Sequence, residues 1–153
     1  MADAYTGQDT IVIEDYDGKF ILSDFADGVV AELVAPTELS TVTTGYNGNC
    51  LGAHNEAGRQ RQCTLRLIKA SSDDKRINTN YNLWKDRDRR FKPLHGWFTK
   101  NVAHEDGSVS IDTVECWFGL PAGQPTQQTD TAGNTEQTVS VYTITFGNSK
   151  RTI

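Results

Sequence analysis

Apolar and polar residues change their spacing sharply within residues 63–84, from a period of two to a helical period. Cys63, Leu65 and Leu67 alternate with more polar neighbours, as in a strand that places one face on a core and leaves the other partly wet. The residues that follow form a helical pattern. A strand that leads directly into a helix is therefore predicted here.

The sequence Ser-Ser-Asp-Asp at residues 71–74 predicts the start of that helix. A serine hydroxyl can accept a hydrogen bond from a free amide of the first turn, and two aspartates place negative charge at the positive end of the helix dipole. Ile77, Tyr81 and Trp84 follow at i, i+4 and i+7 and lie on one stripe. We expect a helix over about residues 72–90 that is anchored to a sheet by these three side chains.

Short β-rich runs separated by turn residues fill much of the remaining chain, at residues 10–14, 19–22, 29–34, 39–44, 94–99, 109–118 and 139–146. Turn residues at 15–18 and an Asp-Gly pair at 106–107 predict hairpins. About eight strands with one helix predict a mainly β fold, an antiparallel β-barrel or sandwich with one flanking helix, as a single domain over residues 1–153. Because strands and helices do not alternate, we do not expect a parallel nucleotide-binding sheet.

Two segments without a regular period are predicted as long loops, at about residues 45–60 and 121–136. The first contains GYNGNCLGAHNEAG and is either a loop or an extended hairpin arm. The second is rich in Gln, Thr, Gly and Pro, and we expect it to be exposed and to order only on contact. Loops of this length are commonly functional or ordered by a partner, although a mobile surface loop is the alternative.

Charge is unevenly distributed along a chain whose net charge is -5. Residues 1–40 carry nine acids and one base, whereas residues 59–100 carry twelve bases and four acids. Oppositely charged ends favour association of one copy with the next, and two independently solvated surfaces are the alternative. The basic and aromatic residues 84–97 hint at nucleic-acid binding, but Asp86 and Asp88 interrupt the bases and the pI is about 5.1.

No motif for catalysis, metal binding or cofactor binding occurs in the sequence. The three histidines are isolated, and there is no zinc spacing, nucleophile elbow, P-loop or dinucleotide turn. We therefore expect no enzyme, no metal and no cofactor.

The three cysteines, Cys50, Cys63 and Cys116, show no paired spacing, and the chain does not start with a signal peptide pattern. This predicts reduced, mostly buried thiols of a cytosolically made protein. The apolar runs are too short for a membrane span.

Two aromatic pairs, Trp97 with Phe98 and Trp117 with Phe118, lie in predicted strands. Neighbours on a strand point to opposite faces, so one member of each pair can enter the core while the other faces a helix or another subunit. A β-sandwich binding module that recognises carbohydrate or a host surface through Trp97, Trp117 and the loops is one function that fits this pattern.

Residues 64–84, TLRLIKASSDDKRINTNYNLW, resemble the strand-to-helix passage of bacteriophage tail tube proteins, especially those of contractile tails. These proteins are related in fold to the type VI secretion tube protein. The family typically pairs a Gly-rich loop with such a strand and a Ser-initiated helix, which here are GYNGNCLGAHNEAG, RQCTLRLIK and a helix from Ser71 or Ser72. The family has no catalytic signature. The segment at residues 121–135 departs from a generic tube subunit.

The resemblance implies a structural virion protein that forms hexameric rings, stacked into the inner tail tube through which phage DNA is ejected. Its partners would be its own copies, with the tail sheath, baseplate and tail terminator, and a baseplate or tube-initiator subunit is a related alternative. DNA would pass without specific binding, and acids among the first 40 residues would contribute to an acidic lumen. The protein would be assembled in the host cytoplasm and reside in the virion tail.

The resemblance also suggests two contact regions. The glycine-rich loop would reach a neighbouring ring through Tyr46, Asn47, Asn49, Leu51, His54, Asn55 and Glu56. The charged helix face would contact another subunit, rather than nucleic acid, through Lys75, Arg76, Lys85 and Arg87.

Overall fold

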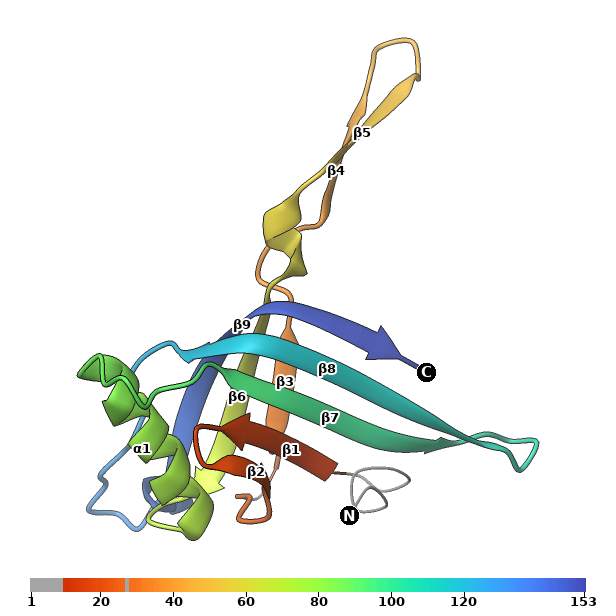
Figure 1. Cartoon of the computed structure of the whole chain (residues 1–153). Helices are drawn as coiled ribbons and strands as arrows, with labels where there is room; N and C mark the ends of the chain where they lie inside the picture. The colour runs from red at the N-terminus through yellow and green to blue at the C-terminus, as the bar shows by residue number, and fades with distance from the viewer. Residues whose placement is uncertain (1–9, 27) are drawn as a thin grey trace.

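The computed structural model describes residues 10–26 and 28–153, which form nine strands and one α-helix (Figure 1). The strands are β1 (Thr10–Asp15), β2 (Gly18–Ile21), β3 (Ala31–Val34), β4 (Ser40–Thr44), β5 (Cys50–His54), β6 (Arg61–Ile68), β7 (Leu94–Ala103), β8 (Val109–Pro121) and β9 (Val139–Thr152). The helices are α1 (Ser72–Lys85) and two 3-10 turns, η2 (Glu56–Arg59) and η3 (Thr135–Thr138). The predicted mainly β class with one flanking helix is confirmed.

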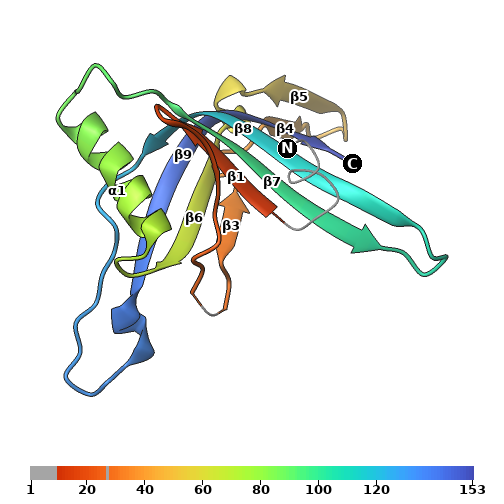
Figure 2. The ribbon, with the colours of Figure 1, turned by 60° about the horizontal axis from the view of Figure 1, so that its bottom comes forward.

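Seven strands form one antiparallel sheet in the order β2-β1-β7-β8-β9-β6-β3. Over the described residues this order has two edges, β2 and β3, so the sheet is open, and of the two predicted alternatives it fits the sandwich rather than the barrel. The sheet is strongly curved, which brings its two halves toward each other in a sandwich-like arrangement (Figure 2). β4 and β5 form a separate two-stranded sheet.

The core lies on the concave side of the curved sheet and follows the predicted alternation. Cys63, Leu65 and Leu67 of β6 are fully buried, and Cys63 and Leu65 stand opposite Ile144 and Tyr142 of β9. The cluster is completed from the other strands, α1 and the residue after β2 by Ile13, Leu22, Ile77, Leu94, Phe98, Cys116 and Phe146. The period of two thus correctly predicted which face of β6 is buried.

The helix begins as predicted, since the Ser71 side chain accepts a hydrogen bond from the backbone N–H of Asp74. It ends at Lys85, earlier than the predicted residue 90. Arg87 adopts a left-handed φ of 53°, and the N–H groups of Arg87 and Asp88 donate to the carbonyls of Trp84 and Leu83. This is a Schellman-type stop, which needs no glycine or proline when a non-glycine residue accepts the strained conformation.

In the described part of the chain, no helix combines the length and apolarity that crossing a membrane requires.

Of the predicted anchor residues Ile77, Tyr81 and Trp84, only Ile77 is buried. Tyr81 is half-buried, and Trp84 is 42% exposed with its ring 5.1 Å from that of Phe91. The buried positions are instead Ile77, Asn80 and Leu83, with Asp73 and Asp74 in the first turn. The face of α1 that contacts the sheet therefore differs from the predicted apolar stripe. Polar side chains also hold the helix on the sheet, and the spacing of apolar residues cannot reveal them.

The segment between β8 and β9, predicted as a loop that orders only on contact, is tied to the sheet. Thr126 pairs with Val141 through backbone hydrogen bonds of 2.9 and 3.1 Å. Glu136 in η3 forms an ion pair of 2.7 Å with Arg66 of β6. These contacts order part of the segment within the chain itself.

Candidate assembly interface

The segment predicted as a loop or a hairpin arm is a hairpin, formed by β4 and β5, that stands away from the main sheet (Figure 1). Its register runs from Ser40 opposite His54 to Thr44 opposite Cys50. All ten strand residues are exposed on both faces. We refer to residues 40–54 as the projecting hairpin.

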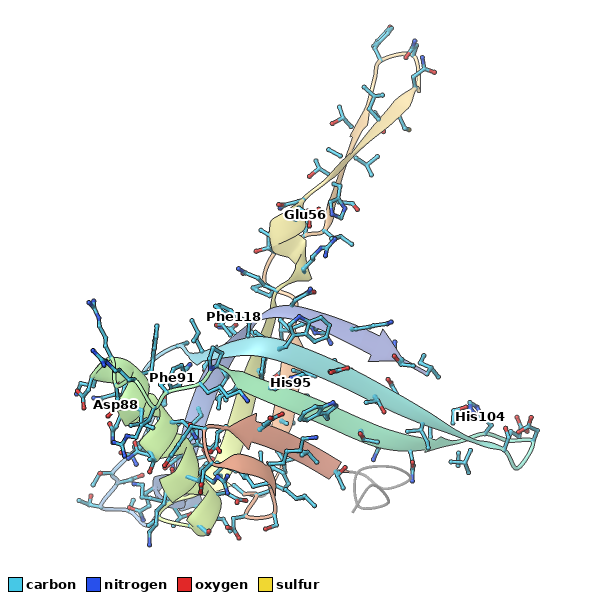
Figure 3. The ribbon with its side chains drawn as sticks, viewed as in Figure 1. Glu56, Asp88, Phe91, His95, His104 and Phe118 are labelled. Carbon is cyan, nitrogen blue, oxygen red and sulfur yellow. The ribbon has the colours of Figure 1, made fainter. Side chains whose placement is uncertain are left out.

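The seven predicted contact residues lie at the tip of the projecting hairpin, in its second strand, and at its base together with the two residues that follow it. Tyr46, Asn47 and Asn49 form the tip, where the Asn47 side chain accepts a hydrogen bond from the Asn49 N–H. Leu51 lies in β5. The remaining residues are at the base, where Glu56 is labelled in Figure 3, and they are His54, Asn55 and Glu56.

The base is held by specific contacts. The Asn55 N–H donates to the Leu39 carbonyl at 2.7 Å, and its side chain donates to the Glu38 carbonyl at 3.2 Å and caps η2. Gly58 approaches so closely that a Cβ there would lie 2.4 Å from the Leu39 Cα. Asn55 therefore fixes the base of the projecting hairpin, and this internal role differs from the inter-ring contact predicted for it.

Apolar side chains on the projecting hairpin face solvent in the isolated chain. Val42 and Leu51 are 67% and 76% exposed, and Tyr46 is fully exposed. Residues 40–53 also lack charged side chains entirely. An isolated two-stranded hairpin is marginally stable in water, and clustered exposed apolar groups typically mark an interaction surface. Val42 was not among the predicted residues, because a β-branched residue in a strand gives no signal that both faces are uncovered.

Arg76, predicted to belong to the inter-subunit helix face, is engaged within the chain. Its guanidinium forms an ion pair with the buried carboxylate of Asp15 and lies 4.0 Å from the centre of the Phe20 ring. Burial opposes ionisation of Asp15, but the hydrogen bonds from Arg76 and Asn80 outweigh it and lower the pKa of Asp15. The other three predicted residues, Lys75, Lys85 and Arg87, are exposed.

The two oppositely charged segments, predicted to form separate ends, meet inside the chain at two ion pairs. Besides the Asp15–Arg76 pair, Glu14 lies 3.4 Å from Lys92. Three other acids of the N-terminal segment lie outside the described residues, at Asp3, Asp9 and Asp27.

The aromatic pairs behave differently in their two strands. In β7, Phe98 is in the core and Trp97 is on the opposite face, with its ring stacked on His95 at 4.2 Å and the Lys19 Nζ 4.6 Å from its centre. In β8, neither aromatic enters the core, which corrects the prediction. Phe118 has a φ of 58° and is 60% exposed (Figure 3), because the β7–β8 register shifts here and gives the core positions to Cys116 and Gly119.

The three thiols are free, but only two are buried as predicted. Cys63 and Cys116 are fully buried, and burial raises the pKa of Cys63 far above its usual range and that of Cys116 to about 11. Cys50 is exposed on β5, because the projecting hairpin has no covered face. Over the described ranges, no three His, Cys, Asp or Glu side chains gather in a metal-binding arrangement.

A second exposed element was not singled out by the sequence. Beyond Thr99 of β7 and Thr113 of β8, the β7–β8 hairpin continues past the register of β1 and β9. Val102, Val109 and Ile111 on this extension are 40%, 62% and 40% exposed. Val109 and Ile111 alternate with polar residues as in a half-buried strand, and this pattern does not reveal that both faces of the extension are exposed.

Sequence comparison finds no matching protein family and no matching curated protein. Comparison with solved structures finds a similar chain in the cryo-EM structure of an extracellular contractile injection system, the PVC sheath–tube complex in its extended state. The TM-score is 0.51 at 10% identity, and the match covers 99% of this chain and 97% of that chain. At this identity the likeness shows a shared fold over nearly the full length of both chains.

Proposed function

We propose that this chain is a structural subunit that assembles with its own copies into the inner tube of a contractile phage tail or a related injection apparatus. Copies would form hexameric rings, and stacked rings would form a hollow conduit for phage DNA inside a sheath, bounded by baseplate and terminator proteins. The role requires no catalysis. The protein would act in the virion tail.

The full-length likeness to a chain of a contractile sheath–tube complex carries this proposal. Because the match covers nearly all of both chains, the two chains have nearly the same length, and the common fold includes the flanking helix as well as the sheet. The resemblance of residues 64–84 to tail tube proteins supports the same class from the sequence.

The projecting hairpin supports self-assembly. Its apolar side chains are uncovered in one copy, and its uncharged surface can be buried without desolvating an ion. A neighbouring ring that covers the tip would stabilise it. The glycan-binding alternative is less favoured, because His95 and Lys19 already occupy ring surface of Trp97 that a sugar would need.

Sedimentation velocity over a wide range of protein concentrations tests the proposal. We expect a concentration-dependent series of large species, and electron microscopy of those species should show rings or tubes. A protein that remains a single monomeric species at all concentrations and salt conditions would contradict the proposal.

A further inference from the structure

We propose that neighbouring copies contact each other laterally, with the tip of the β7–β8 hairpin of one copy against the C-terminal end of α1 of the next. The lateral arm consists of residues 100–112. The helix-end patch consists of Trp84, Lys85, Arg87, Arg89 and Phe91. This inference rests on the proposed self-assembly and names two surfaces that carry it.

The lateral arm presents apolar side chains on both faces. Val109 and Ile111 are two residues apart on β8 and therefore share a face, whereas Val102 lies opposite Ser110 and belongs to the other face. All three are at least 40% exposed. Three exposed aliphatic side chains on a two-stranded extension gain stability when a partner covers them.

The tip of the lateral arm is acidic. Asp106 accepts hydrogen bonds from the Ser108 N–H and hydroxyl at 2.9 and 2.6 Å, which lower the pKa of Asp106 and fix its carboxylate in the turn. Glu105 is exposed and forms no ion pair with the described residues. Residues 104–108 therefore carry two negative charges and no Lys or Arg.

The helix-end patch is basic and contains an exposed aromatic ring. Trp84 is 42% exposed beside Phe91. Lys85, Arg87 and Arg89 are exposed, and in the described part of the chain none of them forms an ion pair. Residues 84–92 contain five bases and two acids, a net charge of +3, and one of the acids, Asp88, is already paired with Arg90 at 3.0 Å.

The two surfaces lie at opposite sides of the molecule. The end of α1 and the β7–β8 turn are the left and right extremes in Figures 1 and 2. In Figure 3, Asp88 and Phe91 mark one side and His104 marks the other. A chain therefore cannot join its own two surfaces, and the contact must be head-to-tail between copies, which closes into a ring when the rotation closes.

Charge complementarity identifies a second copy as the occupant. An acidic tip of charge -2 matches a basic patch of charge +3, and each surface adds exposed apolar groups that an ion alone would not cover. The projecting hairpin points across the line that joins these surfaces (Figure 1). Lateral contacts would thus build rings, while the projecting hairpin would join one ring to the next.

Charge reversal tests the contact. One variant is Glu105→Arg, and the other combines Arg87→Glu with Arg89→Glu. Each variant alone should require at least about tenfold more protein for half-assembly, because like charges then face each other. Mixing the two variants should restore assembly, since the altered tip fits the altered patch and each wild-type surface meets its wild-type partner. Lys150→Glu, at an exposed position of β9 outside both surfaces, is the matched control and should assemble normally.

Carbodiimide cross-linking of the wild-type protein provides a second measurement that needs no variant. It should join Glu105 or Asp106 of one copy to Lys85 of another. Variants that assemble like the wild type, a mixture that stays dissociated, or cross-linked assemblies without this peptide pair would overturn the lateral contact while leaving the proposed function standing. If reversing Arg87 and Arg89 abolished DNA binding but left assembly unchanged, the patch would be assigned to nucleic acid instead. Wild-type protein that never assembles would contradict the proposed function as well.

Discussion

The carboxylate of Asp15 on β1 accepts two hydrogen bonds, each 2.9 Å long, from the guanidinium of Arg76 on α1. The Asn80 side chain donates a third hydrogen bond to the same carboxylate at 2.9 Å. The Asp15 side chain is fully buried, whereas the Arg76 side chain is 30% exposed. A charged network, in addition to apolar packing, thus fixes the helix on the sheet.

Replacing Arg76 with Met should destabilise the folded chain. The substitution keeps the aliphatic part of the side chain but removes the guanidinium, which leaves the Asp15 carboxylate buried without its cation and removes the contact with the Phe20 ring. We expect the free energy of unfolding to fall by roughly 3 kcal/mol. This is at the lower end of the cost of removing one partner of a buried ion pair, because Arg76 is partly exposed. Denaturant unfolding of the monomer measures this, and Lys75→Met is a matched control that should cost less than about 0.5 kcal/mol.

The same network should make stability depend on pH. The pKa of Asp15 is lowered in the folded state, so its contribution is complete above the unfolded pKa of about 4 and is lost as the pH falls through the lower folded value. The difference in unfolding free energy between wild type and Arg76→Met should therefore be largest at neutral pH and shrink below about pH 4. A difference that stays constant down to pH 2 would show that Asp15 is not the titrating group.

Ile77 and Trp84 should differ strongly in their importance for folding. Ile77 is buried in the core, and Ile77→Ala should cost about 2 to 5 kcal/mol of unfolding free energy. Trp84 is 42% exposed, so Trp84→Ala should cost about 1 kcal/mol or less in the isolated chain. Thermal or denaturant unfolding of both variants checks this, and a cost above about 3 kcal/mol for Trp84→Ala would place the ring in the core.

The sequence predicted the parts of the fold that follow from regular periods and turn residues. The alternation of Cys63, Leu65 and Leu67 gave the buried face of β6, and Ser71 gave the start of α1. The face of α1 that contacts the sheet could not be predicted, because Asn80 and Arg76 dock through a carboxylate 61 or more residues away. Polar docking contacts of this kind leave no periodic signal.

The candidate interface could likewise be predicted only in part from the sequence. Glycines and asparagines in residues 45–58 indicated an irregular or hairpin segment, and that hairpin is present. The exposure of Val42 and of the lateral arm could not be predicted, because a strand that projects from the sheet has the same local pattern as one within it. Which surfaces remain uncovered depends on strand order and register, which sequence alone does not provide.

Thiol labelling should distinguish one cysteine from the other two. Cys50 is exposed, whereas burial protects Cys63 and Cys116 and raises the pKa of both thiols. We expect iodoacetamide to modify the native monomer once, at Cys50, and to modify all three positions only after unfolding. Peptide mass spectrometry identifies the sites, and equally rapid labelling of Cys63 would contradict the buried β6 face.

The exposed apolar side chains of the projecting hairpin should matter for assembly but not for folding. Leu51→Ser removes an apolar group that is 76% exposed, so unfolding of the monomer should change by less than about 0.5 kcal/mol. Sedimentation should show weaker assembly, by at least about tenfold in concentration, if a neighbouring copy covers this side chain. Ile153→Ser is the matched control, because Ile153 is also 76% exposed but lies at the end of the chain. Equal effects of the two substitutions would remove the projecting hairpin from the interface.

Electron microscopy of concentrated wild-type protein tests the central claim most directly. Class averages should show rings with an open centre and side views of stacked rings, with density for the projecting hairpin crossing from one ring to the next. Uniform particles of single-chain size across the concentration range would contradict the tube assignment.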